Sequence, residues 1–320
     1  MSGDRLDLER PRYKQDHFSG RFWHFFDMAN PLNIFATNAE LQSAVELLQQ
    51  YKSGQEPRET TDSQVWHAQK LYNSAFHPDT GEKQTLIGRM SFQVPGGLIL
   101  VGGMLAFYKS NVQVVMWQFF NQSFNAVVNY TNRNANSPIT KKQMAVAYAS
   151  ATTTATITAT FLNRMTKAAP PILQRWVPFA AVAAANCVNI PFMRQQELKS
   201  GVTVSDEEGN PLGQSKKAAM KGIAQVCISR ISMAASAMIP IPVIMRLLER
   251  TSSFKLRTRQ SWLLQTLLSG IILVVAVPMG CSLFPQTCSM ALDDLEADLQ
   301  DSIRRQYGSR ITRVYFNKGL

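Results

Sequence analysis

Acidic residues are missing from long stretches of this 320-residue sequence. After Glu82 the next carboxylate is Glu197, although ten lysines and arginines lie between them, and residues 209–292 contain only Glu249. The surface of a water-soluble domain normally carries charges of both signs throughout its length. The net charge of +11, from 33 basic and 22 acidic residues, therefore does not describe an ordinary basic soluble protein.

Histidine and cysteine are also scarce, with four of each. The four histidines never take the spacing of metal ligands, and no zinc-type cysteine pair is present. No Ser-His-Asp or Cys-His set forms a recognisable nucleophile motif, and the glycine pairs at 96–97 and 102–103 lack the Lys-Ser/Thr of a phosphate loop. We therefore expect no metal site, no cofactor and no enzymatic activity, and we expect the cysteines to be free thiols.

The basic residues are scattered singly and in pairs between long uncharged runs. A nucleic-acid-binding protein instead gathers them in clusters or along one helix face, so we expect no nucleic acid as a partner. Scattered basic residues of this kind are typical of the loops of membrane proteins. The N-terminus carries Asp4, Asp7 and Glu9 and lacks an apolar core or an Arg-rich amphipathic helix, which predicts no cleaved signal or presequence.

Five uncharged or nearly uncharged runs are candidates for membrane spans. Residues 143–163, 176–193 and 260–292 contain no charge, and residues 223–245 contain only Arg230. Because a span needs about 20 mostly apolar residues, each of these runs is long enough or nearly so. The shorter run 94–108 either continues through Lys109 into residues 112–120 or forms a re-entrant segment. The sequence thus predicts an all-α, multipass helical membrane protein with about five transmembrane helices in residues 93–288.

Two aqueous regions are expected to flank this membrane domain. Residues 1–92 hold 12 of the 22 acidic residues and all four histidines. Thr37 and Thr61 each begin a capping-box pattern, with Glu or Gln three residues later, so we expect a soluble helical region there. Residues 289–320 are expected to form a C-terminal amphipathic helix and tail, because leucines and an isoleucine recur on one helical face between 292 and 303.

Polar side chains inside the predicted spans are costly unless they have partners or a function. Asn121, Asn125, Asn129 and Asn132 follow one another at helical intervals and form an amide stripe. This stripe serves either interhelical hydrogen bonding, an interfacial amphipathic helix, or the binding of a solute.

Two further features are unusual for a membrane span. Asn186 and Asn189 lie on a helix that we expect Pro178 and Pro191 to interrupt. Arg230 is either a helix-end arginine that reaches the headgroups or a ligand for a solute. The predicted substrate-binding residues are Asn121, Asn125, Asn129, Asn186, Asn189 and Arg230.

The predicted spans contain amides and one arginine but no carboxylate, which limits the kind of solute. A carboxylate proton relay and an acidic cation site inside the membrane are both disfavoured. A small zwitterion fits instead: an arginine or a half-helix N-terminus binds its carboxylate, and amide or freed backbone oxygens bind its ammonium group.

Several longer motifs resemble those of one known family. They are His77-Pro78-Asp79-Thr80-Gly81-Glu82-Lys83, Ile87-Gly88-Arg89-Met90-Ser91, Asn121-Gln122-Ser123-Phe124-Asn125-Ala126, Val177-Pro178-Phe179-Ala180-Ala181-Val182-Ala183-Ala184-Ala185-Asn186-Cys187 and Val314-Tyr315-Phe316-Asn317-Lys318-Gly319-Leu320. On these residues the chain resembles the sideroflexins, from about Pro11 to its last residue. It departs from the family at Asn30-Pro31-Leu32, where the family tends to Asp-Pro-Arg, and this puts an ion-pair role of that segment in doubt.

The resemblance implies a multipass protein of the mitochondrial inner membrane that moves serine, and other small neutral amino acids, in support of one-carbon metabolism. It also implies a link to iron and haem homeostasis. The competing hypothesis is a non-transporting membrane scaffold that assists assembly of respiratory or haem-synthesis enzymes. Direct iron transport is a third and weaker hypothesis, since the ligands for it are missing. The expected partners are serine, mitochondrial membrane lipid and other membrane proteins.

Overall fold

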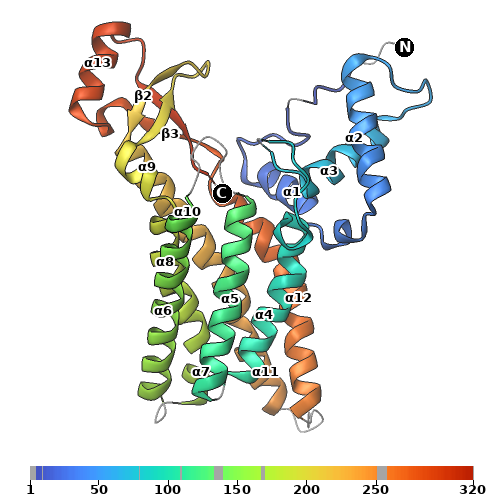
Figure 1. The fold of residues 1–320 in the computed structure, drawn as a ribbon, viewed down its shortest axis with the longest axis vertical. Helices are drawn as coiled ribbons and strands as arrows, with labels where there is room; N and C mark the ends of the chain where they lie inside the picture. The colour runs from blue at the N-terminus through green and yellow to red at the C-terminus, as the bar shows by residue number, and fades with distance from the viewer. Residues whose placement is uncertain are drawn as a thin grey trace.

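In the computed structural model, two smaller regions sit at the same end of a bundle of long helices (Figure 1). The structure describes residues 5–8, 10–78, 80–108, 110–132, 140–166, 170–250 and 258–319. Asp79 and Leu320 of the family-like motifs lie outside these ranges. The N-terminal helices and the C-terminal sheet form the two smaller regions, at the top of the bundle in Figure 1.

The N-terminal region is built from three helices and three 3-10 turns: α1 (Phe18–Met28), η1 (Pro31–Phe35), α2 (Asn38–Ser53), α3 (Asp62–Ala75), η2 (Leu86–Gly88) and η3 (Met90–Phe92). Both predicted capping boxes are confirmed, because Thr37 and Thr61 each exchange hydrogen bonds with the third residue of the helix that follows. The sequence analysis missed α1. In the segment that departs from the family, the Asn30 side chain caps η1 by accepting a hydrogen bond from the Leu32 backbone N–H at 3.0 Å.

Six long helices form the bundle: α4 (Gln93–Phe107), α5 (Asn111–Thr131), α6 (Lys141–Met165), α8 (Val177–Met193), α10 (Lys216–Met238) and α12 (Thr258–Ser282). Each packs against two neighbours in the order α4, α5, α6, α8, α10, α12 and back to α4, so the helices close into a ring. The short helices α7 (Pro171–Gln174), α9 (Gln195–Ser200) and α11 (Pro240–Arg250) lie at its ends. Because α4 ends at Phe107 and α5 begins at Asn111, the run 94–108 and residues 112–120 do not form one helix.

Within the described residues, four stretches are long and apolar enough to cross a membrane: Met90–Phe107, Pro171–Met193, Lys216–Glu249 and Ser261–Ser282. The fifth expected run, 143–163, lies in α6, which is long enough but is rich in threonine and alanine and therefore less apolar. The run 260–292 is not helical throughout, because its last residues form a strand. The fold is confirmed as a multipass helical membrane protein.

A small sheet covers part of one end of the bundle and was not anticipated by the all-α prediction. Its four antiparallel strands are ordered β2 (Pro211–Ser215), β1 (Val202–Ser205), β4 (Arg313–Asn317) and β3 (Thr287–Ala291). The amphipathic helix expected from residue 292 begins later, as α13 (Ala297–Tyr307). Leu295 and Ile303 of the predicted apolar pattern are nevertheless buried together with Phe316. The pattern therefore marks residues of one core, although Leu295 lies outside the helix.

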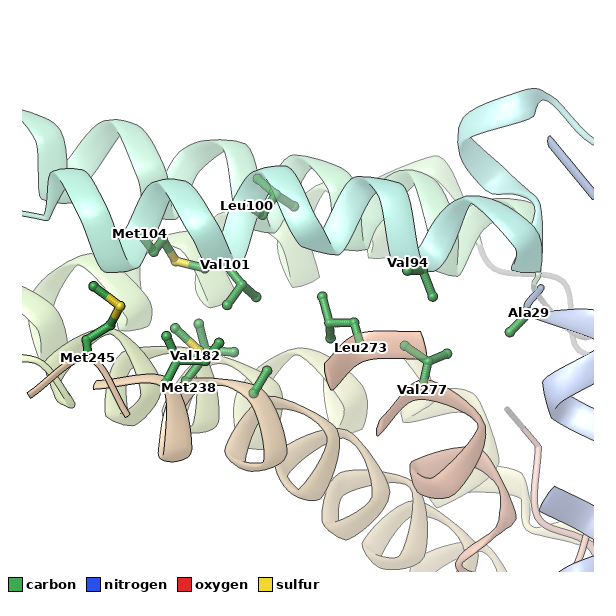
Figure 2. Close-up of a cluster of buried hydrophobic side chains, with 12 residues drawn as sticks. Ala29, Val94, Leu100, Val101, Met104, Val182, Met238, Met245, Leu273 and Val277 are labelled. Carbon is green, nitrogen blue, oxygen red and sulfur yellow. The ribbon is translucent and has the colours of Figure 1, made fainter. Parts of the chain in front are cut away.

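The largest apolar core lies between α4, α10, α11 and α12 (Figure 2). Met104 of α4, Met238 of α10 and Met245 of α11 are each almost completely buried there. Leu273 and Val277 extend this core along α12 toward α1. This part of the ring is therefore filled mainly with apolar side chains.

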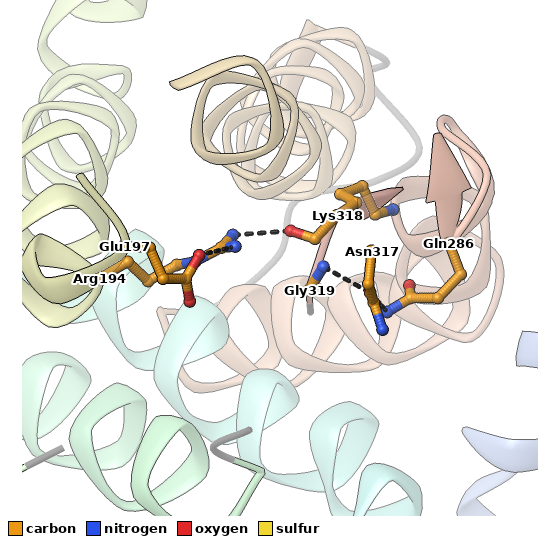
Figure 3. A network of polar contacts seen from close by, with 6 residues as sticks. All are labelled: Arg194, Glu197, Gln286, Asn317, Lys318 and Gly319. Atoms are coloured by element: carbon orange, nitrogen blue, oxygen red, sulfur yellow. Dashed lines mark hydrogen bonds and ion pairs between the residues drawn. The ribbon is translucent and has the colours of Figure 1, made fainter. Parts of the chain in front are cut away.

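The C-terminal tail is fastened to the ring by Arg194, at the end of α8 (Figure 3). Arg194 donates from Nη1 to the Lys318 carbonyl oxygen at 2.8 Å and from Nε to the Glu197 carboxylate at 2.9 Å. Gly319 follows with a φ of +75°, and a Cβ there would lie 3.0 Å from the Arg194 guanidinium. The Lys318 ammonium donates to the Phe284 carbonyl oxygen at 3.0 Å, and burial lowers its pKa.

Replacement of Arg194 by leucine should destabilise the protein, because it leaves the buried Glu197 carboxylate without its partner and releases the tail. Breaking one side of a buried ion pair costs about 3–5 kcal/mol. The double variant Arg194→Leu/Glu197→Leu should recover much of the loss. Thermal unfolding of the purified protein measures both. Arg304→Ala is the control, since its pair with Asp293 is exposed and should contribute less than about 1 kcal/mol.

Candidate functional site

Helix α5 has the reverse of the polarity expected for a helix in water. Its exposed face is apolar and consists of Val112, Val115, Met116, Phe119, Phe120 and Val127. Its buried face carries Gln118, Asn121 and Gln122, which are spaced on one helical surface. A helix with an apolar outer face and a polar inner face suits a position between lipid and a polar interior. The interfacial-helix alternative does not fit, because α5 lies in the ring beside α4 and α6.

The predicted asparagine stripe divides into residues with different roles. Asn132 has a structural role: its Nδ2 donates to the Gly88 carbonyl oxygen at 2.8 Å, and its Oδ1 accepts from Gln84 at 3.1 Å. It therefore joins the end of α5 to the N-terminal region. Asn121 is buried, whereas Asn125 and Asn129 are half-buried on the same helix face.

Arg230 reaches across the ring to this stripe. Its Nη2 donates to Asn129 Oδ1 at 3.1 Å, although α10 and α5 are not neighbours in the ring. The guanidinium is therefore directed toward α5. Two predicted site residues, 101 positions apart in sequence, are thus brought together.

Asn186 and Asn189 are both buried on α8, which packs between α6 and α10. The prediction that prolines interrupt this helix is wrong: Pro178 lies in its first turn, and the helix continues through Pro191 to Met193. Pro191 has no N–H, however, so the carbonyl oxygen four residues earlier, at Cys187, lacks its usual helical donor. This carbonyl lies on the same turn as the two asparagines.

Several buried polar atoms have no hydrogen-bond partner among the described residues. On α5 they are Trp117 Nε1, Gln118 Oε1, Asn121 Nδ2 and Gln122 Nε2, and on α10 the hydroxyl of Ser229, next to Arg230, is in the same state. The other end of the Gln118 amide donates to the Tyr108 hydroxyl at 2.7 Å. An unpartnered buried amide costs about 1–3 kcal/mol, so a set of them on one helix face indicates groups kept for a ligand.

These atoms extend the candidate site along α5. Eleven residues separate Gln118 from Asn129, which is about 16 Å along the helix axis. The predicted site residues included Asn121, Asn125 and Asn129 of this helix. Gln122 was recognised beside the stripe but was not among them, and Gln118 and Ser229 were not anticipated. The two glutamines follow the same spacing as the asparagines, so the helical periodicity contained the signal that would have found them.

The structure also bears on the predictions for the cysteines and for metal ions. Cys187, Cys227, Cys281 and Cys288 are all free thiols, as expected. Cys288, outside the candidate spans, donates to Gln225 Oε1 at 3.1 Å, and burial raises the pKa of its thiol. Within the described part of the chain, no group of three or more His, Cys, Asp or Glu side chains is placed to hold a metal ion.

Comparison with known proteins identifies the family. The family model described as Sideroflexins matches residues 7–320. The chain is 53% identical to mouse (Mus musculus) Sideroflexin-2 and 50% identical to mouse Sideroflexin-1 over the full length of both proteins. It is 51% identical to human (Homo sapiens) Sideroflexin-2, over all of this chain and 99% of that protein. No solved structure matches the chain significantly. The chain therefore belongs to the sideroflexin family.

Proposed function

We propose that this protein is a carrier of the mitochondrial inner membrane that moves serine and other small neutral amino acids, and that it acts as a transporter and not as an enzyme. The observation that supports this most directly is the Arg230–Asn129 hydrogen bond across the ring. It places one cation among amides, with no carboxylate beside it. Through this transport the protein supports one-carbon metabolism, and the proposal includes a link to iron and haem homeostasis.

The polar groups match the chemistry of a zwitterion. The Arg230 guanidinium binds the substrate carboxylate in a bidentate pair, and the Asn129 amide oxygen that it now contacts is displaced. The amide oxygens of Asn125, Asn186 and Asn189 accept hydrogen bonds from the ammonium group. Asn121 and Gln122 offer N–H groups to the serine hydroxyl or carboxylate as the substrate moves along α5.

A substrate without net charge agrees with the absence of carboxylates from these helices. No Asp or Glu occurs in the sequence between Glu82 and Glu197, which includes α4, α5, α6 and α8. A free cation would leave its charge unbalanced in this site, whereas a zwitterion satisfies Arg230 and leaves its ammonium to the amides. Transport then needs no carboxylate proton relay.

Replacement of Arg230 by glutamine should reduce uptake of labelled serine into liposomes that contain the purified protein. The substrate loses a charge-assisted hydrogen-bond pair, about 1.5–3 kcal/mol, which corresponds to roughly 10- to 100-fold in affinity. Asn125→Leu should also reduce uptake. Arg230→Lys should give an intermediate value, because lysine keeps the charge but not the planar bidentate geometry.

Ser236→Ala is the matched control on α10, since among the described residues the Ser236 hydroxyl bonds only to the carbonyl oxygen one turn earlier in its own helix. It should transport at the wild-type rate. If the wild-type protein shows no saturable serine uptake, the carrier proposal fails and the scaffold hypothesis is favoured. If the wild type transports and both Arg230→Gln and Asn125→Leu are normal, the function stands and the site is wrong.

The unpartnered amides on α5 predict opposite effects on stability and transport. Gln122→Leu removes a buried polar group that has an unmet donor, so it should raise the stability by about 1 kcal/mol or more while lowering uptake several-fold. Asn132→Leu also replaces an amide by leucine, at the C-terminal end of the same helix. Because it removes hydrogen bonds to Gly88 and Gln84, it should lower the stability. Thermal unfolding and liposome uptake, measured on the same preparations, compare the two variants. A loss of stability in Gln122→Leu would show that this amide is structural.

A further inference from the structure

The exposed apolar residues of the N-terminal region are confined to its junction with the bundle. They are Phe18 and Trp23 of α1, Leu32 and Phe35 of η1, and Leu86 and Ile87 of η2. Leu32 and Phe35 are 70% and 75% exposed. Between residues 36 and 85, which include α2 and α3, the described residues expose no large hydrophobic side chain. We name these six residues the collar.

The collar residues lie on segments that pack directly on bundle helices. Helix α1 packs against α12, η1 against α4 and η3, and η2 against α5. The attachment of α1 is firm, because the buried Arg21 donates to the Ser282 carbonyl oxygen at the end of α12 at 3.0 Å. The collar therefore has a fixed position around one end of the ring.

The outer faces of the same bundle helices are also apolar, and they lead toward the collar. On α12 the exposed residues are Leu263, Leu267, Ile271 and Val275, which form a stripe with one residue per turn. On α5 the exposed apolar face includes Phe119, Phe120 and Val127, and this helix ends against η2. The helices with these apolar outer faces are thus the ones on which the collar segments pack.

We propose that the collar lies in the bilayer, at the boundary between headgroups and acyl chains. Helix α1 and η1 are then interfacial segments, and within the N-terminal region only the α2–α3 pair projects into water. The composition fits this position, because aromatic residues are enriched at that boundary and amphipathic helices lie along it. The aqueous region expected for residues 1–92 is then smaller than the sequence indicated. The collar also fixes the level of the membrane at this end of the ring, near the first residues of α4.

Carbene labelling of the unmodified protein tests the proposal. The protein is reconstituted in phosphatidylcholine liposomes with a diazirine reagent dissolved in the acyl chains, illuminated, and mapped by mass spectrometry. Peptides that contain residues 18–35 and 86–87 should be labelled within about twofold of the outer face of α12, and about tenfold more than peptides from α2. Labelling of the collar no stronger than that of α2 would overturn the proposal.

Hydroxyl radicals generated in the water around the same liposomes test whether a protein, instead of lipid, covers the collar. A collar covered by another protein or a second copy of this chain is protected from both reagents, and that result also overturns the proposal. A spin label provides an independent measurement. With the four native cysteines replaced by alanine, a label at Phe35→Cys should collide more often with oxygen than with a water-soluble nickel chelate, and a label at Gln49→Cys on α2 should show the reverse.

Discussion

The hydrocarbon of a bilayer offers no hydrogen-bond partner, and this constraint explains where the polar side chains of this protein lie. On α5 the exposed face is apolar, and the glutamine and asparagine side chains face the protein interior. Arg230 follows the same rule, since its guanidinium finds a partner on the opposite side of the ring instead of in the lipid. Once the ring closes, polar groups that would be costly in any span become the lining of its interior.

Different side chains pack the two sides of the ring, and both packed surfaces differ from the polar face of α5. Ala147, Ala151, Ala155 and Ala159 of α6 are fully buried at intervals of four residues, and they let α6 and α8 approach closely. The α4, α10 and α12 side is filled by methionine, leucine and valine. The unpartnered amides of α5 lie elsewhere, where the cost of burying them is compensated only if a ligand uses them.

Local features were the most predictable from the sequence. Thr37 and Thr61 begin helices as expected, because a capping box depends only on residues three positions apart. The strands were missed because each has at most five residues and their partners lie up to about a hundred positions away, as in the pairing of Ser205 with Tyr315. Helix α1 was missed because no capping side chain precedes it, although Phe18, Phe22 and Phe25 recur at helical intervals.

Composition and pattern along the chain were enough to predict a helical membrane protein without carboxylates over long stretches, because length, charge and hydropathy need no knowledge of the fold. They also placed the asparagines on one face of a helix, since helical periodicity is local. The fold was needed to show that Asn132 joins two regions while Asn129 contacts Arg230. That choice depends on which helices become neighbours and which face each other across the ring. Residues 101 positions apart carry no local signal of their contact, so packing alone assigns their roles.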